Sequence, residues 1–148
     1  MRACALLLGL LLAGAARAHE VRPAYLELKE IAVDTYDLFW KVPARGADER
    51  LALHLRLPES CRNAAPPSTT MHDVAYVERS RVVCPGGLTG GEVHVEGLAA
   101  TLTDVLARVE RADGSTQVTR LTPDRPSFVV EAAPSALEVV RKIGRAHV

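Results

Sequence analysis

The chain has 148 residues, with 18 Lys and Arg against 18 Asp and Glu, so its formal net charge at pH 7 is zero. This length suits about one domain, and the balanced charge excludes a basic nucleic-acid binder. With 48% hydrophobic and 24% charged residues, the composition also excludes disordered, collagen-like and coiled-coil proteins. We therefore expect one globular domain that does not bind nucleic acid.

The first 18 residues have the three parts of a secretory signal peptide. Met1-Arg2 is a short positive start, residues 3–16 form a leucine-rich apolar run, and Ala16-Arg17-Ala18 places small residues where signal peptidase reads them. An uncleaved anchor or a buried apolar helix is the alternative, although the run is short for a bilayer core of about 30 Å. We predict a signal-peptide helix over residues 1–18 and an exported, periplasmic or otherwise extracytoplasmic chain that begins at His19.

The other end of the chain also differs from a folded domain. Residues 143–148, Ile-Gly-Arg-Ala-His-Val, match one reading frame of a widely used sequencing adapter, so we expect this tail to be an artefact. Residues 136–142 are expected to start a linker or stalk. Without Arg2, Arg17 and Arg145, 15 basic residues remain against 18 acidic ones. The domain expected over residues 19–135 is therefore mildly acidic.

Three cysteines are present, and Cys4 lies within the predicted signal peptide. The remaining pair, Cys61 and Cys84, is an even count in an exported domain, which favours a disulfide. A metal or redox role is the alternative, but their spacing is not the C-x-x-C pattern of such sites. Two free thiols are the third possibility. We predict a Cys61–Cys84 disulfide that ties down the loop over residues 58–70.

Apolar and polar residues alternate along most of the chain after residue 23, which is typical of strands with one buried face. No long amphipathic helix interrupts them, and Asp113-Gly114 is a hairpin signal. Residues 51–57 alternate most regularly and end at Pro58. We predict an all-β fold, an Ig-like antiparallel β-sandwich of seven to eight strands. The expected strands are residues 24–29, 35–42, 51–57, 75–84, 92–96, 101–110, 116–121 and 127–131.

Motifs of common enzymes are absent from the sequence: it has no G-x-S-x-G, no P-loop, no dinucleotide fingerprint and no H-E-x-x-H. Gly86-Gly87 and Gly90-Gly91 resemble a phosphate-binding loop, but no helix is expected to follow them, so turns are the better interpretation. The carboxylates are scattered on expected solvent faces. We therefore expect a non-enzymatic protein.

Histidines give the main chemical signal. If cleavage follows Ala18, His19 offers its α-amino and imidazole nitrogens to one ion, a chelate that suits Cu²⁺ or Ni²⁺. His72-Asp73, at a loop edge, supplies a second imidazole and a carboxylate. We predict a metal site formed by His19, His72 and Asp73. The alternative is that all of these are surface residues without a ligand. Further candidate ligands are Glu20, His54 and His94.

Several stretches together resemble the HupE/UreJ family. They are residues 19–28, 34–37, 40–43, 84–88, 97–105 and 117–123, and they span nearly all of residues 19–140. The resemblance implies a larger bacterial membrane protein with an exported N-terminal domain followed by several transmembrane helices, linked to nickel or cobalt uptake for hydrogenase and urease. That link attaches mainly to His and Asp positions in membrane helices that this sequence lacks, so transport is carried over to no residue here.

The leading hypothesis is thus the N-terminal extracytoplasmic domain of a C-terminally truncated HupE/UreJ-like protein, accessory to nickel or cobalt uptake. Its partners would be its own missing transmembrane part or another membrane protein, together with a divalent metal ion. The alternative is a secreted or periplasmic structural or protein-interaction β-sandwich with no metal role. A copper oxygenase with an N-terminal histidine is disfavoured, because one Trp and three Tyr leave few aromatic residues for a substrate surface.

Overall fold

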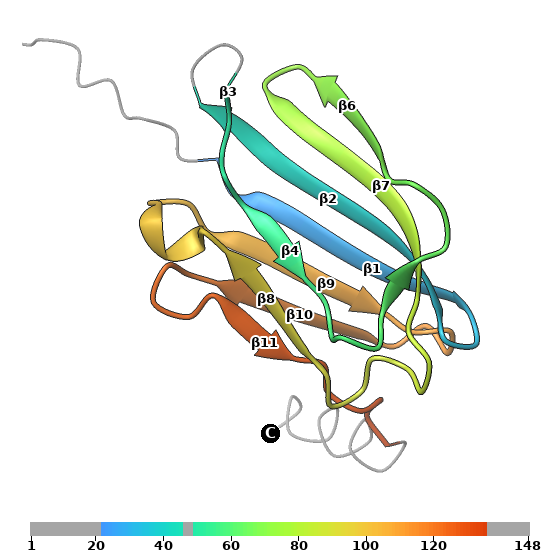
Figure 1. The fold of residues 1–148 in the computed structure, drawn as a ribbon. Helices are drawn as coiled ribbons and strands as arrows, with labels where there is room; N and C mark the ends of the chain where they lie inside the picture. Colours follow the sequence, from blue (N-terminus) through green and yellow to red (C-terminus); the bar gives the residue numbers. More distant parts are fainter. Residues whose placement is uncertain (1–21, 46–48, 136–148) are drawn as a thin grey trace, which may run out of the picture.

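The computed structural model describes residues 22–45 and 49–135. The predicted signal-peptide helix over residues 1–18, the ligand His19, the linker over 136–142 and the tail over 143–148 lie outside the described residues. The described residues form two β-sheets packed face to face, with one 3-10 turn as the only helical element among them (Figure 1). The predicted all-β sandwich is confirmed.

The described part of the chain contains eleven strands and the turn η1. Eight of the strands coincide with the eight expected from alternation, two of them (β8 and β10) with the expected ends and the others with different ends, and three short strands are additional. The elements are β1 (Ala24–Ala32), β2 (Thr35–Arg45), β3 (Glu49–Arg50), β4 (His54–Arg56), β5 (Arg62–Asn63), β6 (Ser68–His72), β7 (Ala75–Val83), β8 (Glu92–Glu96), η1 (Leu98–Ala100), β9 (Val105–Glu110), β10 (Thr116–Leu121) and β11 (Ser127–Val129).

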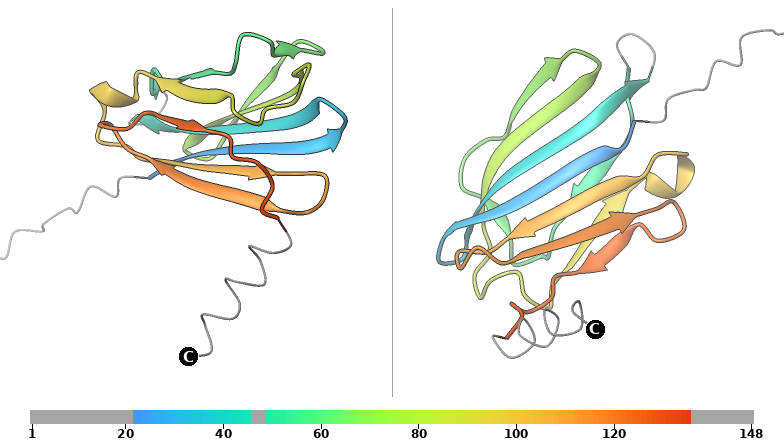
Figure 2. Two further views of the ribbon diagram at one scale, coloured as in Figure 1. Left: turned by 90° about the horizontal axis from the view of Figure 1, so that it is seen from below. Right: turned by 180° about the vertical axis from the view of Figure 1, so that it is seen from behind.

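The two sheets differ greatly in size. The large sheet has the order β10-β9-β1-β2-β7-β5, with β3 also paired to β2 and β6 to β7, whereas the small sheet has the order β11-β8-β4. Figure 2 shows the two layers from below and from behind. All pairs are antiparallel except β1 and β9, so the expectation of a wholly antiparallel sandwich is wrong at that pair. After β8 the chain passes through η1, which lies at the end of the sandwich where β1 begins (Figure 1). β9 therefore starts beside the start of β1, with Val105 opposite Ala24, and the two strands run parallel.

The core lies between the sheets and follows the period-two pattern. From Ala24 to Leu28 on β1 and from Tyr36 to Val42 on β2 the buried residues are every second one, and Trp40, in the middle of β2, is only 1% exposed. Full burial of a Leu or Val side chain stabilises a fold by about 1.5–3 kcal/mol. The principal inward residues of both sheets are Ala24, Leu26, Leu28, Tyr36, Leu38, Trp40, Val42, Leu53, Val93, Val95, Val105, Ala107, Val109 and Phe128.

The strand expected over residues 51–57 is much shorter in the structure. Only His54–Arg56 pairs with β8, although Leu53 is fully buried and the leucines around it pack against the core edge. The pairing ends at Gly97, which has a φ of 86° and whose missing side chain lets it approach the Ala52 carbonyl closely. A Cβ at Gly97 would overlap that carbonyl oxygen, so only glycine fits at this position without a shift of the backbone.

Residues 58–70 were expected to form a loop, but they contain β5 and most of β6. Both strands pair with β7 and extend the large sheet at its edge, with Arg62 opposite Val83 and Thr69 opposite Glu78. Their side chains are exposed, so they bury no apolar face. Hydrophobic alternation could not reveal them for that reason.

Candidate functional site

His72 and Asp73 lie at the turn between β6 and β7. His72 is the last residue of β6 and pairs with Ala75, which leaves a two-residue turn. Asp73 adopts a φ of 51° there, a conformation that Asp tolerates better than most residues. Both side chains belong to exposed residues. The tight turn thus presents an imidazole and a carboxylate side by side to solvent.

These two residues border a surface hollow of about 480 Å³. Its other lining residues come from the start of β1, the end of β2 and the start of β7, and they include Arg22 and Pro23, the first described residues. Its complete lining is Arg22, Pro23, Tyr25, Lys41, Pro43, His72, Asp73, Val74 and Ala75.

The charges around this hollow are mixed. Asp73 and a neutral His72 are suitable ligands for a cation, whereas Arg22 and Lys41 repel one. Among the described residues, no three His, Cys, Asp or Glu side chains gather as a metal-binding group. His72 and Asp73 therefore need at least one further ligand from outside the described residues, and the predicted set with His19 stays a prediction.

The histidines at positions 54 and 94 lie elsewhere, on the small sheet. His54 on β4 is opposite Glu96, and Arg56 is opposite His94 on β8, so these four residues share the face of the small sheet that points away from the core. Arg56 Nη2 forms an ion pair with Glu96 Oε2 at 2.8 Å. His72 belongs to the edge of the large sheet, so His54 and His94 do not share a site with His72.

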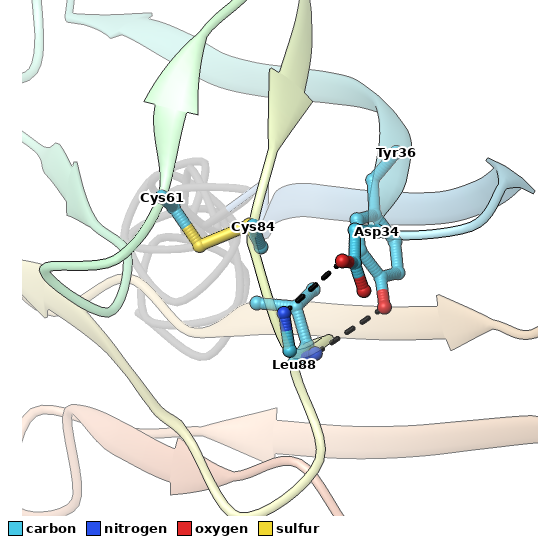
Figure 3. The surroundings of a disulfide bond; sticks show 6 residues. Asp34, Tyr36, Cys61, Cys84 and Leu88 are labelled. Atoms are coloured by element: carbon cyan, nitrogen blue, oxygen red, sulfur yellow. Dashed lines mark hydrogen bonds between the residues drawn. A yellow bond between two sulfur atoms is a disulfide. The ribbon is translucent and has the colours of Figure 1, made fainter.

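The predicted Cys61–Cys84 disulfide is confirmed, with a Cα–Cα distance of 4.0 Å. Cys84 directly follows β7 and is fully buried, while Cys61 precedes β5 and packs against the core edge. Figure 3 shows the bond beside the turn that joins β1 to β2. The bridge holds the edge segment with β5 against the end of β7.

The turn after Cys84 is fixed by two side chains of the β1–β2 hairpin (Figure 3). The Gly86 amide donates to Asp34 Oδ2 at 3.1 Å, and the Leu88 amide donates to Tyr36 Oη at 3.2 Å. Burial raises the pKa of Tyr36 above its usual value, so the hydroxyl stays protonated beyond the pH at which an exposed tyrosine ionises. Gly86 and Gly87 have φ values of 84° and 77°, so they are turn glycines, as expected. This segment has a structural role.

Sequence reasoning missed a second concave region, between β4 and β7. Glu78 and Ser80 face the inner side of the large sheet there, because they pair with the inward residues Trp40 and Leu38. The alternation of residues 75–84 predicted a strand but gave no reason to expect polar residues on its inner face. The only signal was that Glu78 and Ser80 interrupt the apolar pattern.

The chain matches no protein-family model and no curated protein. The resemblance to the HupE/UreJ family therefore stays a prediction from the residues themselves. In the described ranges, no helix has the length and hydropathy needed to span a membrane.

Proposed function

We propose that this chain is the exported, non-enzymatic domain of a HupE/UreJ-like membrane protein and that it binds a divalent metal ion as an accessory to nickel or cobalt uptake. Three features support the exported location: the signal-peptide pattern of residues 1–18, the Cys61–Cys84 disulfide and the all-β sandwich. Disulfides persist in oxidising compartments and are rare in the cytosol.

One observation carries the metal role: Arg22, which is close to His19 in the sequence, lines the same hollow as His72 and Asp73. His19 is three residues before Arg22, and three residues of extended chain reach at most about 10 Å. This length is enough for His19 to reach the hollow, and we propose that it does. Its α-amino and imidazole nitrogens, with the His72 imidazole and the Asp73 carboxylate, make a three-nitrogen, one-oxygen set that suits Ni²⁺ or Cu²⁺.

Titration with Ni²⁺ tests this site on the exported protein whose N-terminus is His19. We expect one ion per chain, with affinity lowered at least about tenfold by His19→Ala and by His72→Ala, since loss of even an outer partner of a metal ligand costs about 10- to 100-fold. Binding should weaken at acidic pH, because protons compete with the metal ion for the imidazole nitrogens. Isothermal calorimetry measures both effects.

His94→Ala is the matched control for that titration, because it removes an imidazole from the small sheet, away from the hollow. Its affinity for Ni²⁺ should equal that of the wild type. The metal role is wrong if the wild type binds no Ni²⁺ or Cu²⁺, or if His19→Ala and His72→Ala bind as tightly as His94→Ala.

A structural or protein-interaction role is the second candidate. Lys41 in the same hollow favours it, because a cationic side chain opposes a metal ion and suits an acidic segment of a partner. In that case, charge reversal at Lys41 weakens partner binding, and Ni²⁺ has no effect on it.

A further inference from the structure

The outer face of the large sheet, which points away from the small sheet, is rich in cations. The right-hand view of Figure 2 looks onto this face. Every second residue along the paired stretches of β10, β9, β1, β2 and β7 lies on it. Its charged residues are the cations Lys29, Lys41, Arg79, Arg81, Arg108 and Arg120 and the carboxylates Glu27, Asp37 and Glu110.

This face has the opposite net charge to the rest of the molecule. The described residues together carry 13 Lys and Arg against 15 Asp and Glu, which is a net charge of −2. The outer face alone, with six cations and three carboxylates, has a net charge of +3. All other described residues therefore carry −5. The cations of a mildly acidic domain are thus concentrated on one side.

The cations also extend further into the solvent than the carboxylates do. Lys29 pairs with Glu110, and their side chains are 52% and 23% exposed. Arg108, which pairs with the same carboxylate, is again the more exposed partner, and so is Arg81 in its pair with Asp37. The ion pairs therefore do not hide the positive charge, because the carboxylates lie beneath the cationic groups.

Two of the cations have no carboxylate partner in the described part of the chain, namely Lys41 and Arg79. The Arg79 guanidinium lies over the Phe39 ring, 5.0 Å from its centre, and Tyr25 meets the same ring edge-on. An aromatic ring attracts a guanidinium without neutralising it. Lys41 is close by, because it pairs with Val77, two residues before Arg79 on β7. These two cations are available to bind an anionic partner.

The extent of the outer face fits an anionic lipid bilayer. Its cations occur on five neighbouring strands, and at about 4.8 Å between strands they span about 20 Å. Such a span suits a surface with many negative charges better than one small anion. Exposed apolar residues lie among the cations, since Leu106 is opposite Arg120 and Val118 is opposite Arg108. Basic residues combined with exposed apolar ones are typical of segments that lie on membrane surfaces.

We propose that the outer face of the large sheet binds the surface of an anionic lipid bilayer. Lys41 and Arg79 contact lipid phosphates, while Leu106 and Val118 enter the headgroup layer. The small sheet then points away from the membrane. Lys41 also lines the hollow of His72, but lipid binding requires no metal ion and is therefore tested in the presence of EDTA.

The probe is a vesicle made of equal parts of phosphatidylcholine and phosphatidylglycerol, compared with a vesicle of phosphatidylcholine alone. Cosedimentation of the purified exported protein with each vesicle measures the binding. We expect binding to the anionic vesicle to be at least tenfold tighter. It should weaken as NaCl is added, because salt screens the attraction between exposed charges.

Arg79→Glu tests the face itself, and Arg56→Glu is the matched control. Both make the same change in net charge, but Arg56 lies on the small sheet, on the opposite side of the sandwich. A basic residue near an anionic membrane changes binding about fivefold, so charge reversal at Arg79 should weaken binding more than tenfold. Arg56→Glu should stay within about threefold of the wild type. If Arg79→Glu does not fold by circular dichroism, Arg79→Gln replaces it, with a loss of about fivefold.

Three outcomes would overturn the proposal. The first is that the wild type binds both kinds of vesicle equally or binds neither. The second is that the Arg79 variant binds anionic vesicles as tightly as Arg56→Glu. The third is that the wild type binds poly-L-glutamate but not anionic vesicles, in which case the outer face recognises an acidic polypeptide and not a lipid surface.

Discussion

Replacing both Cys61 and Cys84 by alanine is expected to lower the free energy of unfolding by about 3 kcal/mol. The bridge joins residues 23 apart in sequence. In the chain-entropy model, closing a loop of that size removes conformational entropy from the unfolded state and raises its free energy by about this much. Denaturation by guanidinium chloride, followed by circular dichroism, measures the difference. A loss of this size is a large fraction of the total stability of a small domain.

Reduction of the wild-type protein is the control for this variant. Wild type in excess dithiothreitol should approach the stability of Cys61→Ala/Cys84→Ala, because both lack the same cross-link. The structural role assigned to the disulfide is wrong if the double variant is as stable as the oxidised wild type, or if reduction leaves the unfolding midpoint unchanged.

Trp40→Ala is expected to cost about 3–5 kcal/mol, which is the range for truncating a large aromatic residue in a core. Trp40 is the largest of the fully buried side chains among the described residues, in the middle of β2. Trp40→Phe should cost clearly less, because it keeps one aromatic ring in the core and removes a buried N–H that has no acceptor among the described residues.

Chemical denaturation followed by far-ultraviolet circular dichroism measures both Trp40 variants, since neither retains a tryptophan for fluorescence. Val118→Ala is the comparison, because Val118 is 60% exposed and surface substitutions usually change stability by less than about 0.5 kcal/mol. If Trp40→Ala is no more destabilised than Val118→Ala, the core does not lie between the two sheets as described.

Alternation predicted the strands that have a buried face and missed those that do not. Tyr36, Leu38 and Trp40 show why β2 could be predicted, because each is buried and the residues between them are not. All residues of β6 are exposed, and this strand is held by backbone pairing to β7, which leaves no hydrophobic pattern. The parallel pairing of β1 with β9 also depends on where the chain crosses between sheets, which local sequence does not record.

The candidate site shows a similar division. The disulfide could be predicted because cysteines of exported proteins become oxidised in the compartment they enter, and only Cys61 and Cys84 follow the predicted signal peptide. The position of His72 at the same hollow as Arg22 could not be predicted from the sequence. About fifty residues separate the two, and the long edge hairpin of β6 and β7 brings them together. The concave region between β4 and β7 could not be predicted either, because it arises from the unequal sizes of the two sheets.

The most direct measurement of the central claim, an exported domain that begins at His19, is the N-terminal sequence and intact mass of the chain expressed with its own first 18 residues in a bacterium. The account predicts a periplasmic protein whose first residue is His19 and whose Cys61 and Cys84 are joined. A chain that retains Met1 in the cytoplasm, with both thiols reduced, would contradict it.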